Sequence, residues 1–187
     1  MAAPAPSPLA GVLLLCVDLQ PAFLKVIPDS DTLLKRCSFV IEAAAGLGIR
    51  VAFTEQLPRK LGGTAPELLK LAPGADVHAK SSFSVFGDDG ITDALRSLDI
   101  EHIILCGIET PVCIYQTALG ALDANLQVTV LSDAIGARRP ADAALCVDAL
   151  TRSGIHVLPA ETVFYALLHD AGHPFFKGFT QLVKKYS

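Results

Sequence analysis

The chain has 187 residues, of which 51% are hydrophobic and 18% are charged, and its formal net charge is -4. This composition excludes a disordered chain, and the length suits a single domain, residues 1–187, with a substantial core. Lys and Arg form no broad basic run, so a nucleic-acid-binding surface is not expected.

The N-terminal segment contains an apolar run that could be mistaken for a signal sequence. Residues 1–9 are rich in Ala, Pro and Ser, and we predict a flexible tail there. The following run, "VLLLCV" (Val12–Val17), has no basic segment before it, ends at Asp18, and is too short to span a bilayer. We therefore expect a buried strand, no membrane partner and a cytoplasmic location, with a mitochondrial association left open.

Short apolar runs alternate with helical patterns along the rest of the chain. With Val12–Val17, the predicted strands are Arg50–Thr54, His102–Gly107, Gln127–Ser132 and Ile155–Pro159. The predicted helices are Asp31–Leu47, Asp89–Leu98, Thr110–Asn125 and Ala141–Ser153, and a turn and an amphipathic helix are predicted in residues 169–187. This alternation indicates a doubly wound α/β fold with a parallel sheet covered on both faces.

A Pro- and Gly-rich segment, Leu57–Gly74, follows the second predicted strand. Ligands bind at the carboxyl ends of strands in such sheets. We therefore predict that this excursion forms part of a pocket wall.

The stretch "GIETPVCIYQTA" places a cysteine where a strand turns into a helix. Thr110 suits the N-cap and Pro111 the first helical position, which puts Cys113 at the third. Unpaired backbone N–H groups and the helix dipole favour a thiolate there, so a lowered thiol pKa is expected. Position alone leaves a catalytic and a structural cysteine equally open.

The other four cysteines lie within predicted strands or helices and are expected to be inert core residues: Cys16, Cys37, Cys106 and Cys146. An odd number of cysteines in apolar segments suits reducing surroundings.

Two charged residues interrupt apolar contexts in the same way as Cys113. Asp18 follows the first strand directly, and Lys80 follows the short run "ADVHA". A cysteine nucleophile benefits from a carboxylate that moves its proton and from a nearby cation. The structural alternatives are a turn-capping Asp18 and a solvated Lys80.

Three segments carry a resemblance to a known family: "LLCVDLQPAF", "AKSSFSVF" and "GIETPVCIYQTALGALDANLQVTVLSDAIGAR". In order and spacing they resemble the isochorismatase-like cysteine hydrolase superfamily, and "TEQLPRKLGGTAPEL" is similar to its eukaryotic isochorismatase domain-containing proteins. The resemblance implies a three-layer α/β/α fold around a six-stranded parallel Rossmann-like sheet, and an Asp18–Lys80–Cys113 catalytic triad.

The resemblance also implies details of the pocket. A cis peptide bond would lie between Ile108 and Glu109, and the backbone N–H groups of Glu109 and Cys113 would form an oxyanion hole. Substrate-binding residues at the pocket floor would be Gln20, Phe23 and Phe83, for which ordinary packing is an equal alternative.

No metal or cofactor is expected. Nicotinamidases of this superfamily carry a D-x-H metal motif after the second strand, where this chain has "TEQLPRK". The pair His169 and His173 lacks the Glu of H-E-x-x-H and a third ligand, which favours a surface position.

These features predict a cysteine-dependent hydrolase of a small-molecule substrate, cleaving a small amide or related C–N bond through a thioester, in a homo-oligomer (dimer or tetramer). A mitochondrial ribonuclease-like enzyme and a non-catalytic binding or scaffold protein are the alternatives.

Overall fold

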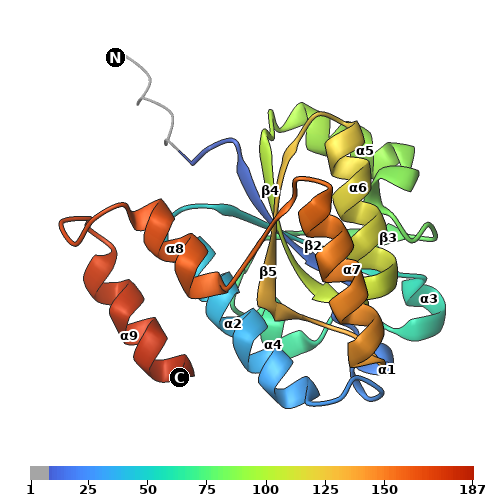
Figure 1. Ribbon diagram of the computed structural model, residues 1–187, viewed down its shortest axis with the longest axis horizontal. Helices are drawn as coiled ribbons and strands as arrows, with labels where there is room; N and C mark the ends of the chain where they lie inside the picture. The colour runs from blue at the N-terminus through green and yellow to red at the C-terminus, as the bar shows by residue number, and fades with distance from the viewer. Residues whose placement is uncertain (1–8) are drawn as a thin grey trace.

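The computed structural model describes residues 9–187, which form one six-stranded parallel sheet between two layers of helices (Figure 1). The strands, in the spatial order β3-β2-β1-β4-β5-β6, are β1 (Val12–Val17), β2 (Arg50–Gln56), β3 (Asp76–Lys80), β4 (His102–Ile108), β5 (Gln127–Gly136) and β6 (His156–Leu158). The predicted three-layer α/β/α fold is confirmed. Sequence patterns had not assigned β3, a short edge strand whose residues are largely exposed.

Helices cover both faces of the sheet. One face carries α2 (Ser30–Gly46), α8 (Ala160–Leu168) and α9 (Phe176–Tyr186) with the short α4 (Pro66–Leu69). The other carries α5 (Asp89–Ser97), α6 (Tyr115–Asp123) and α7 (Pro140–Arg152) with the 3-10 turn η1 (Val85–Gly87). Two further single turns, α1 (Pro21–Leu24) and α3 (Pro58–Leu61), lie in loops, and the π-helical turn η2 (Thr110–Ile114) precedes α6.

Sequence patterns had not predicted α8, although its signal is present. The buried residues Ala160, Val163, Phe164 and Leu168 recur at helical spacing. The backbone N–H of Ala160 at the start of α8 donates to the Asp133 carboxylate on β5, which also binds Arg36 of α2. These contacts fix α8 beside α2.

Aromatic side chains fill the core under α2, α8 and α9. The rings of Phe39, Phe164 and Phe179 have centroids 5.7 to 6.2 Å apart, and all three side chains are fully buried. Leu9 packs against the same core, so the tail predicted for residues 1–9 does not include it. The rest of that predicted tail lies outside the described residues.

The strand order reverses beside β1. The chain runs outward through β2 and β3 on one side of β1 and then returns to place β4 on the other side. In an open α/β sheet, such a switch point opens a crevice at the carboxyl ends of the two central strands. Asp18 follows β1 and Cys113 follows β4, so both lie at this crevice.

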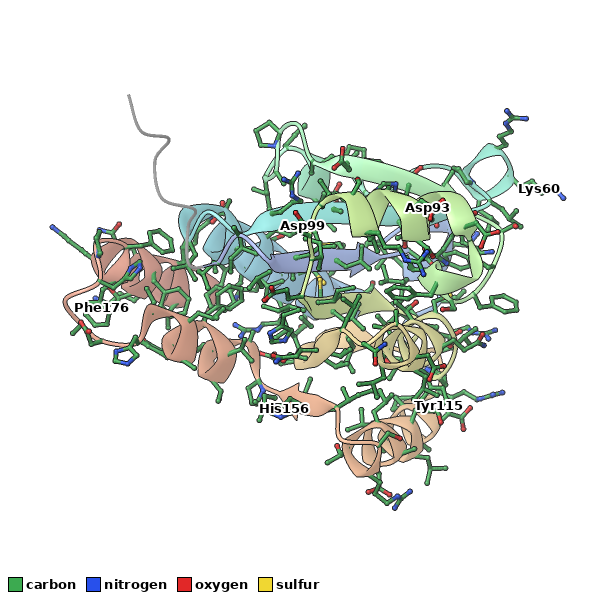
Figure 2. The ribbon with its side chains drawn as sticks, turned by 90° about the horizontal axis from the view of Figure 1, so that it is seen from above. Lys60, Asp93, Asp99, Tyr115, His156 and Phe176 are labelled. Atoms are coloured by element: carbon green, nitrogen blue, oxygen red, sulfur yellow. The ribbon has the colours of Figure 1, made fainter. Side chains whose placement is uncertain are left out.

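Helix α3, at the start of the excursion after β2, and the start of α9 lie at opposite ends of the molecule. Figure 2 shows Lys60 on α3 at one end and Phe176 on α9 at the other. In residues 9–187, no helix is both long and apolar enough to cross a membrane.

Gly107 allows β4 to lie close against β1, and we predict that it does not tolerate a side chain. Its φ is +117°, and a Cβ atom there would lie 2.2 Å from the Val17 carbonyl oxygen. Gly107→Ala should lower the free energy of unfolding by at least about 3 kcal/mol in urea denaturation.

Gly154→Ala is the matched control. Gly154 also has a positive φ, +86°, but a Cβ atom there meets nothing within 4 Å. Only backbone strain remains, and it should cost about 1 kcal/mol. Equal losses for the two variants would show that contact with β1 is not what requires Gly107.

Candidate active site

Asp18 occupies the end of β1 with its carboxylate turned into the protein. Its φ of +53° bends the chain out of the strand, and its backbone N–H donates to the Thr54 carbonyl at 3.1 Å. The Thr54 hydroxyl donates to Asp18 Oδ1 at 2.8 Å, and Lys80 Nζ donates to Asp18 Oδ2 at 2.7 Å. Asp18 is 1% exposed, so its carboxylate is paired with Lys80 at a position almost closed to water.

Lys80 lies at the end of β3, and its side chain is fully buried rather than solvated. Its ammonium reaches past the end of β2 to Asp18 and also donates to Gln56 Oε1 at 2.7 Å. Longer contacts join Nζ to the backbone carbonyls of Ser82 (3.3 Å) and Phe83 (3.4 Å). A buried charge requires such partners, because removing it from water without them is costly.

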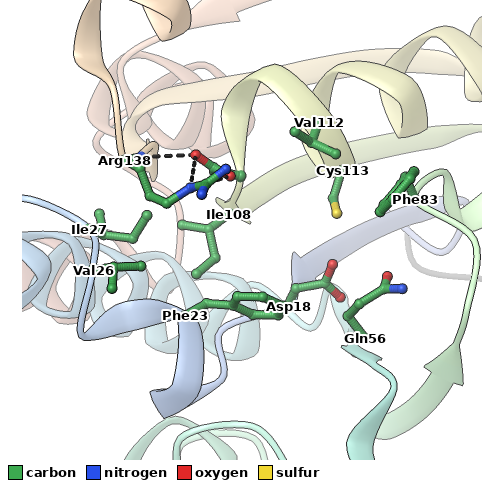
Figure 3. A pocket seen from close by; sticks show the side chains of 11 residues that line it. Asp18, Phe23, Val26, Ile27, Gln56, Phe83, Ile108, Val112, Cys113 and Arg138 are labelled. Atoms are coloured by element: carbon green, nitrogen blue, oxygen red, sulfur yellow. Dashed lines mark hydrogen bonds and ion pairs between the residues drawn. The ribbon is translucent and has the colours of Figure 1, made fainter. Parts of the chain in front are cut away.

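Cys113 completes the group, so the structure brings all three predicted catalytic residues together. Its sulfur lies 3.8 Å from Lys80 Nζ, and the Asp18 side chain and the Glu109 backbone both influence the pKa of its thiol. In Figure 3 the Cys113 sulfur and the Asp18 carboxylate face the same cavity. Asp18, Lys80 and Cys113 come from three different segments, each at the carboxyl end of its strand.

The expectation of a lowered thiol pKa is wrong. Burial and the Asp18 carboxylate raise the pKa of Cys113 to about 12, while Lys80 and the Glu109 backbone contact lower it only in part. The resting thiol is therefore neutral at physiological pH. The sequence pattern identified the helix start but not the depth of burial or the adjacent carboxylate, which depend on tertiary structure.

The turn that carries Cys113 also differs from the prediction. Thr110 is not the N-cap; its hydroxyl donates to the Gly136 carbonyl at 3.0 Å, and the N-cap residue is Glu109. The Glu109 carbonyl accepts from the N–H groups of Val112 and Ile114, so the chain makes a π-helical turn in which Cys113 is fourth. The peptide bond between Ile108 and Glu109 is cis, at the position that the resemblance implies.

A cavity of about 370 Å³ opens in front of Cys113. Both predicted phenylalanines, Phe23 and Phe83, line it, and Phe83 is 54% exposed at its edge (Figure 3). The other lining residues are Asp18, Val26, Ile27, Gln56, Ile108, Glu109, Val112, Cys113 and Arg138. Most of these side chains are apolar.

Two predictions about the pocket wall are wrong. Gln20 does not line the cavity, because its side-chain amide faces the backbone: it accepts from Gln56 N at 2.7 Å and donates to Gln56 O at 3.1 Å. The excursion Leu57–Gly74 does not line it either. The excursion instead packs behind the site, where Ala65 N–H donates to the Leu19 carbonyl.

Sequence reasoning missed two polar residues of the cavity, Gln56 and Arg138. Both residues were missed because the predicted strands ended too early. Strand β2 continues past the predicted end at Thr54 to Gln56, and β5 continues past Ser132 to Gly136. Arg138 Nε donates to both Glu109 carboxylate oxygens at 3.1 Å, which holds an ion pair at the rim (Figure 3). A polar residue at or just beyond the end of a buried strand was the available signal for both.

The described part of the chain shows no cluster of metal-ligating side chains. Residues 9–187 contain no group of three or more His, Cys, Asp or Glu side chains that could hold a metal ion. His169 is exposed and pairs with Asp170, and His173 Nδ1 accepts from the Phe175 backbone.

Comparisons with known proteins identify the family of this chain. Residues 12–162 match the family described as "Isochorismatase domain". "Isochorismatase domain-containing protein 2" of Danio rerio is 35% identical over 174 residues, which cover 92% of this chain and 86% of the relative.

Two solved structures share the fold. "MAR1 Ribonuclease from Caenorhabditis elegans" has a TM-score of 0.88 at 29% identity, over 94% of this chain and 91% of that one. The ycaC gene product of Escherichia coli, an "octameric hydrolase of unknown specificity", has a TM-score of 0.82 at 19% identity, over 100% and 98% of the two chains. Because the family match extends over most of its length, this chain belongs to the isochorismatase family.

Proposed function

We propose that this protein is a cysteine-dependent hydrolase that cleaves a small amide or related C–N bond through a thioester on Cys113. The observation that carries the proposal is the buried Asp18–Lys80 pair in contact with a cysteine at the end of a cavity. Membership of the isochorismatase family supports a hydrolase. No cofactor is part of the proposed reaction.

The first half-reaction begins from the neutral thiol. Asp18 takes the thiol proton as the sulfur attacks the carbonyl carbon, so no free thiolate has to be stored. Lys80 stabilises the negative charge that passes between sulfur and carboxylate. The carbonyl oxygen becomes an oxyanion, for which we propose the backbone N–H groups of Glu109 and Cys113 as donors.

Collapse of the tetrahedral intermediate then breaks the C–N bond. Asp18 returns its proton to the departing nitrogen, and the acyl group stays on Cys113 as a thioester. In the second half-reaction Asp18 takes a proton from water, whose oxygen attacks the thioester carbonyl. The C–S bond breaks, the carboxylic acid leaves, and the cysteine sulfur recovers the proton held by Asp18.

The cavity limits the substrate to a small molecule with an apolar body. Its volume of about 370 Å³ lies near the lower end for small-molecule sites. Phe23, Phe83 and Val112 give the cavity apolar walls, while the ion pair of Glu109 and Arg138 lies at its rim. We propose Phe23 and Phe83 as substrate-binding residues.

A ribonuclease activity is the second candidate, because the Caenorhabditis elegans structure carries that name. The apolar cavity and the net charge of -4 favour a small neutral substrate over a polyanion. RNA cleavage by the purified protein that is lost in Cys113→Ala would support this alternative.

We also propose that the protein assembles into a homo-oligomer. The octameric structural neighbour supports this proposal.

Cys113→Ala should abolish hydrolysis. In a panel of small aliphatic, aromatic and ureido amides, any substrate cleaved by the wild type should be cleaved at least about 10³-fold more slowly by this variant, since the nucleophile is gone. Release of amine or ammonia measures the rate. Cys146→Ala, at a half-buried site on α7, should keep the wild-type rate. Retention of full activity by Cys113→Ala would rule out the thioester.

Asp18→Asn should separate thiol reactivity from turnover. The Asp18 charge raises the pKa of Cys113, so its removal lowers that pKa, and iodoacetamide should alkylate Cys113 faster than in the wild type at neutral pH. Hydrolysis should nevertheless fall by about 10² to 10⁴-fold, because the proton acceptor is lost.

The exposed Asp123→Asn on α6 is the control and should change neither rate. Thermal unfolding of each variant checks the fold, because Asp18→Asn leaves the Lys80 charge without its partner. A folded Asp18→Asn protein that hydrolyses at the wild-type rate would contradict the role of Asp18 as the base.

A further inference from the structure

The Lys80 ammonium has two short hydrogen bonds, and only one of them goes to a charged group. Asp18 Oδ2 and Gln56 Oε1 each lie 2.7 Å from Nζ, whereas the Ser82 and Phe83 carbonyls lie at 3.3 and 3.4 Å. An ammonium has three N–H donors. Asp18 and Gln56 therefore each accept from one N–H group of Lys80. The third N–H group points toward the weaker carbonyl contacts and the Cys113 sulfur.

The Gln56 amide can present only its oxygen to Lys80. Its Nε2 donates to the Ser81 carbonyl at 2.8 Å, while its Oε1 accepts from Lys80. A flipped amide would place NH₂ against the ammonium and oxygen against the carbonyl, losing both bonds. Gln56 is 6% exposed, so water does not replace these partners easily.

The backbone of Gln56 is held in turn by Gln20. Gln20 Oε1 accepts from Gln56 N at 2.7 Å, and its Nε2 donates to Gln56 O and to Gly62 O. Gln20 is fully buried, and these backbone contacts join the end of β1 to the end of β2. Gln56 and Lys80 are also neighbours in the register of β2 and β3.

We propose that Gln56 is a positioning residue that holds the Lys80 ammonium between Asp18 and Cys113, and that Gln20 acts through Gln56. This inference rests on the proposed role of Cys113 as a nucleophile. Gln56 provides a hydrogen-bond acceptor without a second negative charge, so the Asp18–Lys80 pair remains neutral overall. That neutrality matters because each negative charge near the thiol opposes formation of the thiolate.

The charged groups around this point are few. Asp18 faces Lys80 from β1, and Cys113 faces it from η2. Glu55, the neighbour of Gln56 on β2, is turned to the other side, where its carboxylate accepts from Thr64. Glu109 and Arg138 are paired at the cavity rim. A carboxylate in place of the Gln56 amide would therefore add its charge directly to the Asp18, Lys80 and Cys113 group.

The test is the pH dependence of Cys113 alkylation by iodoacetamide, with peptide mapping to assign the modified cysteine. Gln56→Glu keeps an acceptor for Lys80 but adds a negative charge, so its profile should move to higher pH by about one unit, which is about tenfold slower labelling at a given pH. The control is Gln116→Glu, at an exposed position of α6, which should match the wild type.

Gln56→Met is the second test variant, for use if Gln56→Glu does not fold. It keeps about the same side-chain volume and adds no charge. The ammonium then loses the hydrogen-bond acceptor that holds it beside the sulfur, so it stabilises the thiolate less and the profile again moves to higher pH. Circular dichroism and thermal unfolding establish which variants are folded. A residue with only a structural role would change stability and leave the profile of the folded protein unchanged.

Folded Gln56 variants whose profiles coincide with the wild type would overturn the proposal, as would an equal shift in Gln116→Glu. The assay needs no substrate, so its outcome is separate from that of the hydrolase. A shift in the Gln56 variants without any amide hydrolysis would retain the positioning role and reject the proposed function. Amide hydrolysis by the wild type, with no shift in the Gln56 variants, would retain the proposed function and reject the positioning role.

Discussion

The buried ion pair between Asp18 and Lys80 is the constraint on which the rest of the site depends. Its atoms lie 2.7 Å apart, with side-chain exposures of 1% and 0%, and each charge would be costly alone. The sheet must therefore bring the ends of β1 and β3 into register on either side of β2. Thr54, Gln56 and Gln20 provide the polar contacts that make this pairing possible, and Cys113 joins the pair from β4.

The fold places these residues through its strand order. Because β4 returns to the opposite side of β1 from β2, the first strand ends between the segments that carry Lys80 and Cys113. Gly107 allows β4 to approach β1 closely, and the Thr110 hydroxyl ties the following turn to the end of β5. The cavity therefore lies among strand ends and turns that the core holds in place. Apolar side chains line most of it, and Asp18 and Gln56 lie at its polar end.

Much of this arrangement could be predicted from the sequence. The strands of the sheet interior are nearly continuous apolar runs; Asp18 follows one of them directly, and Cys113 lies in the turn after another. The edge strand β3 was missed because exposed residues give it no such pattern. Gln20 was assigned to the pocket from its proximity to Asp18, but a neighbour in sequence can face the backbone instead. The raised pKa of Cys113 depends on burial and on Asp18, neither of which its helical position reveals.

We propose that Cys113 rests as a neutral thiol and that Asp18 activates it only when the sulfur attacks the substrate. The most direct measurement is the ultraviolet absorbance of the thiolate as a function of pH, taken as the difference between wild type and Cys113→Ala. A neutral resting thiol should give no thiolate absorbance from Cys113 below about pH 10. Full thiolate absorbance at neutral pH would contradict it and would indicate a nucleophile stored in its charged form.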